Sequence, residues 1–405
     1  MIRDIFIPAD ILLPEGSYSE KWSVIACDQF SSERDYWERV RERVAGEPST
    51  FNMIIPEAYL EEIDEEQEIK KIRAAMDDYL KRGVLREIRE SFIYVERTQP
   101  DGRVRRGIVG TVDLEEYEFS RLDALILASE GTVLERLPAR IRIRRAARLE
   151  LPHVMAFIDD ADEAVIEPLA QKTDSLPLLY DFELMEGGGR IKGWQVAGRE
   201  VEAVIIALRK LFKRNNFLMV IGDGNHSLAG AKVYWDEIKT SLTEAERLTH
   251  PARRALLEVN NVYDPAISFE AIHRVITGVD AEKFAGEFIE ALPPGSDYEL
   301  RWVYKGGGGS AGVKADSIGA MIAAVQAFID GYIERTGCKV DYIHGEEALT
   351  RLAGEDDAFG ILLPAMDKSG LFATVGTSGV FPRKSFSVGH ARDKRYYLEC
   401  RDITK

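Results

Sequence analysis

Near the middle of the chain the sequence reads FLMVIGDGNHS, from Phe217 to Ser227. Residues 217–221 form a short unbroken apolar run, which is typical of a strand that is buried on both faces. The residues that follow, 227–239, predict a helix. The loop Gly222-Asp223-Gly224-Asn225-His226-Ser227 is therefore expected where a buried strand passes into a helix.

Two β-hairpins are expected before this loop in the sequence. Residues 91–97 and 107–112 are β-prone and are joined through the turn-forming triplet Pro100-Asp101-Gly102. A second pair of β-prone runs surrounds the glycines at 187–189. The sequence predicts these strands at residues 178–185 and 191–196.

Amphipathic patterns predict several helices. The first is expected over 36–44, with Ser32 and Asp35 as a capping box. Further helices are expected between Pro56 and Gly83 and over 201–215. Nearer the C-terminus, residues 299–304, 306–309 and 318–333 predict a strand, a loop and a helix in turn.

These elements together indicate a mixed α/β (α+β) fold of layered mixed sheets with flanking helices. The chain has 405 residues, of which 45% are hydrophobic, so it can bury a large core in two or three structural units. We expect an N-terminal α/β segment over residues 1–125, a central segment with the loop over 126–261, and a C-terminal α/β segment over 262–405.

The charge of the chain bears on its partners. The formal net charge is −16, and duplex binding draws much of its strength from Lys and Arg that neutralise phosphates. The sequence also lacks a clear helix-turn-helix or a basic-aromatic stripe. We therefore do not expect nucleic acid as a partner, and rank DNA binding below a small-molecule or nucleotide ligand. The sequence makes no prediction of oligomeric state.

Cysteine usage and hydropathy favour a reducing, non-membrane compartment. The three cysteines, Cys27, Cys338 and Cys400, lie far apart without metal-like spacing, which argues against a disulfide framework and a zinc site. Residues 1–20 lack the uninterrupted apolar core of a signal peptide. No run approaches the roughly 18 apolar residues of a membrane span. We expect a cytoplasmic protein.

The loop has the chemistry of an anion site. Free backbone N–H groups and the positive end of a helix dipole attract phosphate, and Gly222 and Gly224 permit tight turns and close approach. A carboxylate at Asp223 suits a divalent metal, a hydroxyl or a proton, with His226 as an acid/base partner. Asn225 and Ser227 are candidate phosphate or nucleotide ligands. The alternative is a plain helix cap built from Asp223, Asn225 or Ser227.

Other polar segments offer candidate residues. Glu130 suits an acid/base or metal-binding role, or alternatively a helix N-terminal carboxylate stabilised by the dipole. Near the C-terminus, Lys384 and Ser385 suit an acidic ligand, or alternatively a plain loop. Asp28 is a candidate cleft carboxylate, whereas its neighbour Cys27 is interpreted as an inert buried thiol. His153 is interpreted as a structural histidine.

The loop also resembles one in a known family. This is the bacterial and archaeal family catalogued as domain of unknown function one thousand and fifteen, often labelled SpoOJ/ParA/ParB/repB family protein. The family has an Asp-Gly-His-His-Arg loop after a buried strand, and here Asn225 and Ser227 replace the first His and the Arg. Glu130-Gly131-Thr132 with the following arginines, up to Arg148, resembles its Glu-x-Thr segment. Arg383-Lys384-Ser385 resembles its C-terminal Lys-Ser segment.

The resemblance implies a function. Similar loops occur in ParB/sulfiredoxin-like proteins, including a free serine kinase that uses ADP as phosphate donor, so the Asp223 loop is expected in a ParB/sulfiredoxin-like element. This implies a phosphotransferase for a small hydroxylated metabolite, with Mg²⁺ and ADP or ATP as cofactors. The residues implied are Asp223 as metal ligand, Asp223, His226 and Glu130 in catalysis, and Gly222, Gly224, Asn225, Ser227, Thr132, Arg140, Lys384 and Ser385 around phosphate.

One feature of the loop opposes a phosphotransferase function. Position 227 lacks the Arg that would clamp phosphate bidentately. The arginines at 136, 140, 142, 144, 145 and 148 supply positive charge nearby in the sequence, with Arg140 favoured by its spacing from Thr132, although charge on a helix usually faces solvent. The alternative function is a non-catalytic, ParB-like nucleotide sensor or partner-binding protein, which would bind nucleotide without consuming it.

Overall fold

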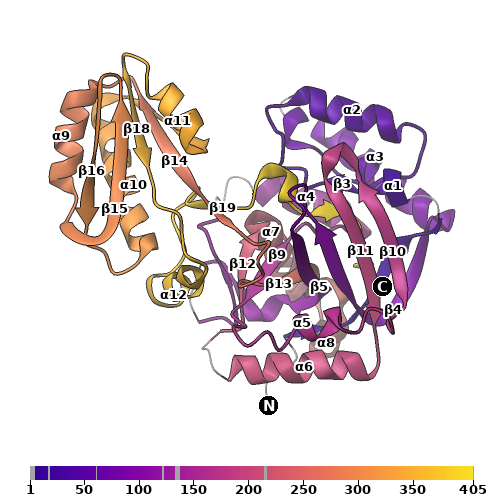
Figure 1. The fold of residues 1–405 in the computed structure, drawn as a ribbon. Coiled ribbons are helices and arrows are strands. Elements are labelled where there is room, and N and C mark those ends of the chain that lie inside the picture. The colour runs from indigo at the N-terminus through magenta and orange to yellow at the C-terminus, as the bar shows by residue number, and fades with distance from the viewer. Residues whose placement is uncertain are drawn as a thin grey trace. The chain divides into compact units, whose positions relative to one another are not determined.

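The computed structural model describes residues 5–16, 19–60, 62–120, 123–132, 137–213 and 217–404. It contains two compact units, each with its own sheet (Figure 1). Unit 1 comprises Met1–Leu127, Thr132–Ile267 and His390–Lys405, and unit 2 comprises Ala128–Gly131 and Ser268–Gly389. The fold is mixed α/β, as the sequence predicts.

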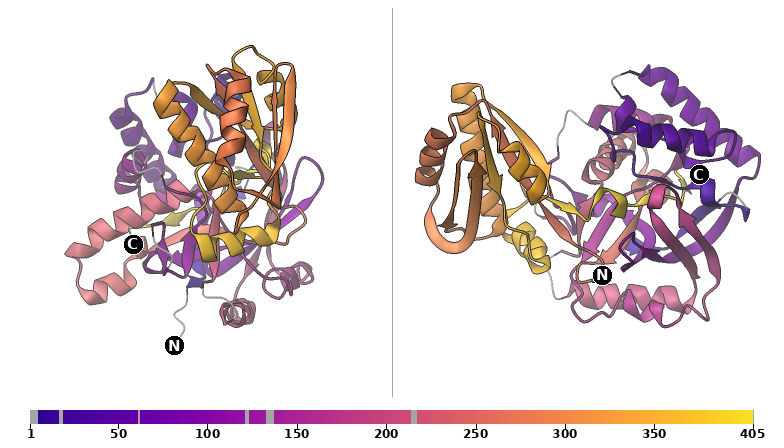
Figure 2. Two further views of the ribbon diagram at one scale, coloured as in Figure 1. Left: turned by 90° about the vertical axis from the view of Figure 1, so that its left-hand side faces the viewer. Right: turned by 45° about the horizontal axis from the view of Figure 1, so that its top comes forward.

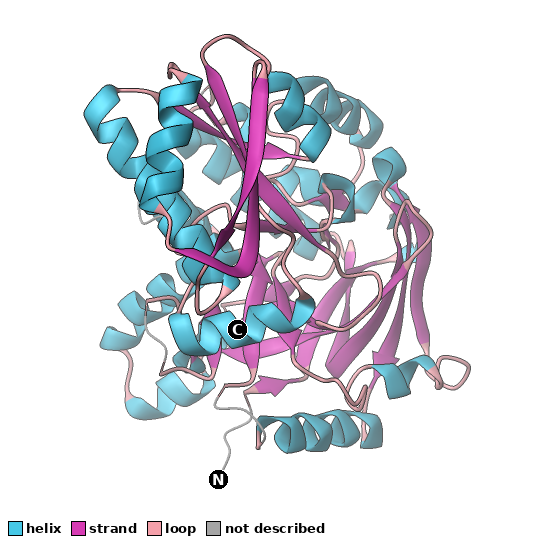
Figure 3. Cartoon of the chain, turned by 60° about the vertical axis from the view of Figure 1, so that its left-hand side comes forward, coloured by secondary structure: helices cyan, strands magenta, loops and turns pink. Residues whose placement is uncertain are grey.

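Unit 1 is built on one large, curved sheet (Figure 3). The strands follow the order β10-β11-β4-β5-β13-β9-β12-β7-β6, with β1 beside β5 and β2 beside β4. Strands β9 and β12, which lead to the site, lie in the interior of this order. The strands are β1 (Phe6–Ile7), β2 (Ala9–Pro14), β4 (Leu85–Thr98), β5 (Val104–Asp113), β6 (Tyr117–Glu118), β7 (Ile126–Ala128), β9 (Met155–Ile158), β10 (Leu178–Leu184), β11 (Gly189–Val196), β12 (Met219–Asp223) and β13 (Arg254–Asn261).

Both hairpins predicted from the sequence are confirmed. Strands β4 and β5 pair antiparallel from Ile93↔Val109 to Thr98↔Val104. Strands β10 and β11 pair antiparallel as far as Leu184↔Gly189. The β-prone runs and the turn-forming residues between them identify both pairs.

The helices of unit 1 begin close to their predicted positions. The expected capping box of α2 is wrong, because Glu33 occupies its N-cap and makes no side-chain cap hydrogen bond. Helix α3 is capped by Asp64, whose side chain accepts from two backbone N–H groups. The helices are α1 (Ser19–Trp22), α2 (Arg34–Val44), α3 (Glu65–Lys81), α4 (Leu137–Ala146), α5 (Glu167–Ala170), α6 (Arg199–Phe212), α7 (Asn225–Ile238) and α8 (Glu244–Thr249).

Unit 2 has a six-stranded sheet in the order β16-β15-β18-β14-β17, with β19 beside β14. Phe359 of β18 packs against Phe284 of α9, whereas the next residue, Gly360, faces Leu349 of α11, so helices cover both faces (Figure 2). The elements are β14 (Phe269–Thr277), α9 (Ala281–Ala291), β15 (Pro294–Tyr304), β16 (Gly307–Val313), α10 (Ile318–Thr336), β17 (Lys339–His344), α11 (Glu346–Leu352), β18 (Ala358–Leu362), α12 (Lys368–Ser378) and β19 (Phe386–Val388).

The predicted loop at 306–309 is wrong, since most of it belongs to β16. A Cβ at Gly309 would lie 2.7 Å from the Trp302 ring, and one at Gly307 would lie 2.5 Å from the Tyr304 ring. These glycines therefore leave room for aromatic rings on β15. Neither flexibility nor a turn is the reason for them.

The compact units differ from the three expected segments. Residues from the N-terminal and central segments share one sheet, because β13 pairs with both β5 and β9. Unit 2 is inserted after β13, and its ends meet where the Gly389 N–H donates to the Ser268 carbonyl at 2.9 Å. The last part of the chain then rejoins unit 1, where β20 (Tyr396–Tyr397) pairs with β3 (Val24–Ile25) and β21 (Arg401–Asp402) pairs with β8 (Leu149–Glu150).

None of the described helices is long and apolar enough to cross a membrane.

Candidate functional site in unit 1

The strand that leads to the loop is buried, as predicted. Met219, Val220 and Ile221 are fully buried in β12, which pairs antiparallel with β9 and has an irregularity between Ile221 and Asp223. A Cβ on Gly222 would lie 2.0 Å from the Phe157 ring. Packing against Phe157 is thus sufficient reason for glycine at position 222.

Gly224 has a different role. Its φ of 77° is left-handed, and it is the N-cap of α7, so that the helix begins at Asn225. The N-cap residue is therefore Gly224, which has no side chain. It is not Asp223, Asn225 or Ser227, the three residues considered for a helix cap. Asn225 is buried and His226 is half-buried, both in the first turn of α7.

Asp223 and Lys394 form the charged centre of the site. One carboxylate oxygen of Asp223, Oδ1, accepts the Gly224 N–H at 3.1 Å. The other, Oδ2, is buried and makes no hydrogen bond to a described residue, although Lys394 Nζ lies 3.4 Å away. The Lys394 side chain is only 8% exposed. A buried ion pair with an incomplete hydrogen-bond shell is costly for folding, which calls for a functional explanation.

His153, which precedes β9, connects this loop to the C-terminal segment. Its Nε2 lies 3.4 Å from Ser227 Oγ, and its Nδ1 lies 2.8 Å from the Tyr397 hydroxyl. The Tyr397 hydroxyl also lies 3.1 Å from Cys27 Sγ and accepts the Cys27 N–H. Tyr397 therefore orients one side of the imidazole and leaves Nε2 towards Ser227.

The segment before α2 adds a thiol and a carboxylate. Burial raises the pKa of Cys27 to about 12, and the nearby Asp28 acts in the same direction. The thiol is therefore neutral at physiological pH, in keeping with the inert role expected from the sequence. Burial alone would raise the pKa of Asp28, but His153, a hydrogen bond from Gln29, and Lys394 lower it below the usual value. Asp28 is accordingly an ionised carboxylate.

The described arginines between residues 140 and 148 are all paired with carboxylates. Arg140 donates to Glu57 at 2.7 Å. Its positive charge also acts to lower the pKa of Cys27 and of Asp28. The remaining pairs are Arg142 with Glu65, Arg144 with Glu150, Arg145 with Glu237, and Arg148 with Asp402. Arg136 lies outside the described residues.

A cavity of about 160 Å³ lies beside these groups. His153, Ser227 and Tyr397 line it, together with Arg140 and Cys27. The cavity therefore has polar groups from the loop, from the C-terminal segment and from the start of the chain.

Three other predicted residues gather in unit 2. Glu130 Oε1 accepts the Ser385 N–H at 3.2 Å, and the backbone N–H groups of Lys384 and Phe386 also bond this carboxylate. Lys384 has a left-handed φ of 58°. Burial raises the pKa of Glu130 to about 7, although these N–H groups and the charge of Lys384 oppose the shift. The predicted residues Glu130, Lys384 and Ser385 therefore form one cluster, and the loop residues form another.

Thr132 lies in unit 1, and its hydroxyl is buried without a hydrogen bond to a described residue. Among the described residues no group of three or more His, Cys, Asp or Glu side chains is arranged to hold a metal ion. Magnesium commonly uses only one or two carboxylates, with phosphate oxygens and water as further ligands. The single buried Asp223 oxygen fits that mode of binding.

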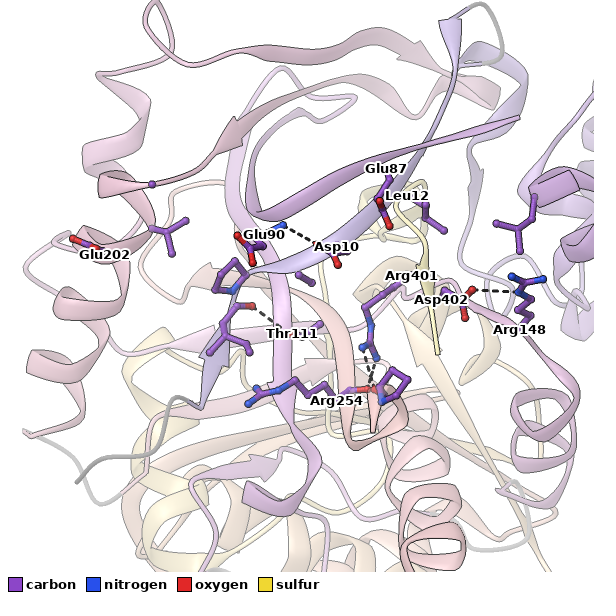
Figure 4. Close-up of a pocket in the computed structure, with 17 residues that line it drawn as sticks. Asp10, Leu12, Glu87, Glu90, Thr111, Arg148, Glu202, Arg254, Arg401 and Asp402 are labelled. Atoms are coloured by element: carbon purple, nitrogen blue, oxygen red, sulfur yellow. Dashed lines mark hydrogen bonds and ion pairs between the residues drawn. The ribbon is translucent and has the colours of Figure 1, made fainter. Parts of the chain in front are cut away.

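A larger cavity, of about 810 Å³, lies elsewhere in unit 1 (Figure 4). Several of its polar groups are already bonded to one another. Arg401 donates to the Arg254 carbonyl, Arg148 donates to Asp402, and Asp10 accepts the Glu90 N–H. Its acidic side chains outnumber its basic ones, which disfavours a phosphate ligand.

Comparison with known proteins establishes the family. The family model described as "Protein of unknown function (DUF1015)" matches residues 12–362. The chain belongs to this family. The resemblance seen in the loop sequence is thus confirmed, whereas the ParB/sulfiredoxin-like element stays a prediction. No curated protein matches this member of the DUF1015 family.

Several solved structures are similar in part. A free serine kinase in complex with AMP is 11% identical over 73% of this chain and 90% of that chain, with a TM-score of 0.38. SbnI from Staphylococcus aureus, truncated at its C-terminus, is 8% identical over 69% and 82%, with a TM-score of 0.38. A conserved hypothetical protein from Pyrococcus furiosus is 10% identical over 73% and 94%, with a TM-score of 0.36. At such scores, these similarities carry no argument about the function of this DUF1015 protein.

The sequence does not single out Lys394 or Tyr397, and it favours a structural role for His153. The structure places all three side chains around the loop. One signal was present, because His153-Val154 directly precedes the apolar strand β9 much as the loop directly follows β12. Antiparallel neighbours bring the start of one strand to the end of the other. For this DUF1015 protein, that pairing is what joins His153 to the loop.

Proposed function

We propose that this protein is a nucleotide-dependent phosphotransferase that acts on a small hydroxylated metabolite. The observation that carries the proposal is the Asp223–Lys394 pair at the start of α7, in which Asp223 Oδ2 is buried without a hydrogen bond to a described residue. Such a carboxylate oxygen is costly unless a ligand uses it. Metal-bound nucleotide phosphate is a ligand that uses both charges.

The residues around the pair support phosphate binding. The first turn of α7 presents the positive end of the helix dipole, and the Lys394 ammonium adds a buried positive charge. Asp223 is the residue that would hold a magnesium ion of the bound nucleotide. When bound, that ion would neutralise charge on the phosphate oxygens.

The proposed reaction needs a proton acceptor, and His153 is assigned this role. The acceptor hydroxyl oxygen forms a bond to the terminal phosphorus, and the bond from that phosphorus to the bridging oxygen breaks. The electron pair leaves with the nucleotide, while the hydroxyl proton moves to Nε2 of His153. Tyr397 at Nδ1 orients the ring, and the ionised Asp28 lies close to it.

The proposal relies on groups of unit 1 alone. His226, in the first turn of α7, remains a proposed donor to phosphate. Glu130, Lys384 and Ser385 belong to unit 2 and have no step in this scheme.

Calorimetry with ADP, ATP and CTP in the presence of Mg²⁺ tests the nucleotide site. We expect one nucleotide to bind, and Asp223→Ala to weaken it at least tenfold, about 1.4 kcal/mol. Glu237→Ala is the matched control, since this exposed carboxylate lies at the far end of the same helix and should leave affinity unchanged. Absence of binding to the folded wild type would remove the proposal.

Turnover separates this function from that of a nucleotide sensor. A phosphotransferase will phosphorylate at least one hydroxyl compound when the bound nucleotide and a metabolite mixture are supplied, as mass spectrometry would detect. A sensor will bind the same nucleotide with the same dependence on Asp223 and leave it intact. That second result would replace the enzyme with the ParB-like alternative.

A further inference from the structure

The cavity beside His153 has a mostly apolar lining and a small group of hydrogen-bonding side chains. Most of its lining belongs to the buried core of unit 1, including Met53, Ile55, Met76, Ala147, Leu149 and Leu256. The hydrogen-bonding group consists of His153, Ser227 and Tyr397, which are joined by the contacts described above. Apart from the ion-paired Arg140, Arg144 and Glu150, the polar side chains of the lining are therefore grouped together.

The charged side chains in the lining already belong to ion pairs. Arg140 is paired with Glu57, and Arg144 is paired with Glu150 at 2.8 Å, although Arg144 Nε is buried without a hydrogen bond to a described residue. An ammonium or carboxylate of a ligand would thus have to lose its hydration and compete with an existing ion pair, which is unfavourable. A polyol would likewise leave several hydroxyls against aliphatic walls.

We propose that this cavity binds the apolar body of the acceptor substrate, an uncharged alcohol with a compact aliphatic or aromatic group. This inference rests on the proposed function and names its substrate class. A volume of about 160 Å³ is close to that of an apolar cavity that binds benzene, about 150 Å³. The hydroxyl is directed to His153 Nε2 and Ser227 Oγ, where the proton is removed.

Methionine methyl NMR with benzyl alcohol as the probe tests the cavity without any nucleotide. Met53 and Met76 line the cavity, and their signals are assigned by Met53→Leu and Met76→Leu. We expect both signals to shift saturably. Met321 and Met366, which belong to unit 2, should not move. Toluene, which lacks the hydroxyl, should bind roughly two- to tenfold more weakly, and L-serine should leave both signals in place.

Cavity size gives a second, independent arm. Ala147→Leu places extra atoms in the lining and should abolish the shifts caused by benzyl alcohol. If this variant fails to fold, the wild type with 2-naphthylmethanol gives the same answer, because that alcohol is too large to enter. Absence of shifts at Met53 and Met76 with benzyl alcohol, or equal shifts with L-serine, would overturn the inference.

The outcome also distinguishes this inference from the proposed function. If benzyl alcohol binds in the cavity but the protein has no phosphotransfer activity, the cavity assignment is supported and the proposed enzymatic function is contradicted. If a zwitterionic or polyol acceptor is phosphorylated and the Met53 and Met76 signals do not change, the enzymatic function is supported and the apolar substrate class is contradicted.

Discussion

The Tyr397 hydroxyl lies 2.8 Å from Nδ1 of His153, and the two residues are 244 positions apart in the sequence. Their rings meet edge to face, with centroids 5.3 Å apart. This contact fixes the plane of the imidazole and determines which nitrogen faces Ser227. A residue from the last strands of unit 1 thereby controls the geometry of a side chain beside the central loop.

Replacing Tyr397 by Phe should destabilise unit 1. The change leaves His153 Nδ1 and the Cys27 N–H without their buried partner, so we expect a loss of about 1–3 kcal/mol of unfolding free energy in denaturant titrations. Tyr117→Phe is the control, because the Tyr117 hydroxyl is buried without a hydrogen bond to a described residue. An equal loss in both variants would contradict the role given to Tyr397.

The Glu130 carboxyl should make the stability of unit 2 depend on pH. Burial raises its pKa in the folded protein to about 7 from the usual 4.5 of a glutamate, so folding favours the protonated form. The stabilisation is complete below about pH 4.5 and is lost as the pH rises through about 7, with a total of about 3 kcal/mol.

Glu130→Gln, which cannot titrate, isolates this contribution. Amide hydrogen exchange in unit 2, followed from pH 5 to pH 8, should show the wild type losing stability relative to the variant. Parallel stability curves for the two proteins would mean that Glu130 does not titrate in this range.

A methyl group at position 222 should be costly. Gly222→Ala places its Cβ against the Phe157 ring, and such overpacking typically costs about 1–3 kcal/mol. Gly286 in α9 has open space around its added Cβ, so Gly286→Ala should instead stabilise unit 2 by up to about 1 kcal/mol. Thermal unfolding of the two variants should therefore shift in opposite directions.

Cys27 should resist alkylation in the native protein. A pKa of about 12 leaves about a thousandfold less thiolate at neutral pH than an ordinary cysteine has. Peptide mass spectrometry after iodoacetamide treatment at pH 7.5 should find Cys27 unmodified in the folded chain and modified in guanidinium chloride. Equal rates in the two states would show that the thiol is neither desolvated nor held neutral.

The local part of the fold was predictable from the sequence, for reasons that the hairpins make clear. Strands β4 and β5 are β-prone runs that share a short turn, so the information lies in neighbouring parts of the sequence. The buried strand before Gly222 was equally visible. The roles of the glycines could not be predicted, because they come from aromatic rings on neighbouring strands. Glycine is needed at position 222 by the Phe157 ring and at position 309 by the Trp302 ring.

The site was predictable only in its loop. Asp223 and Ser227 stand in a recognisable strand-to-helix junction, whereas Lys394 and Tyr397 lie in a segment with no pattern of its own. Their positions depend on β20 pairing with β3, a contact across nearly the whole chain. Residues brought together by such long-range pairing have no characteristic separation in the sequence, so a single sequence does not predict their contact.

The insertion of unit 2 before the last strands also has a consequence for the order of synthesis. Translation adds Lys394 and Tyr397 only after all of residues 268–389 have been made. A nascent chain that ends within unit 2 has the central loop, but neither the ammonium beside Asp223 nor the phenol beside His153. The pocket is therefore completed only after unit 2 has been synthesised, long after its first residues have left the ribosome.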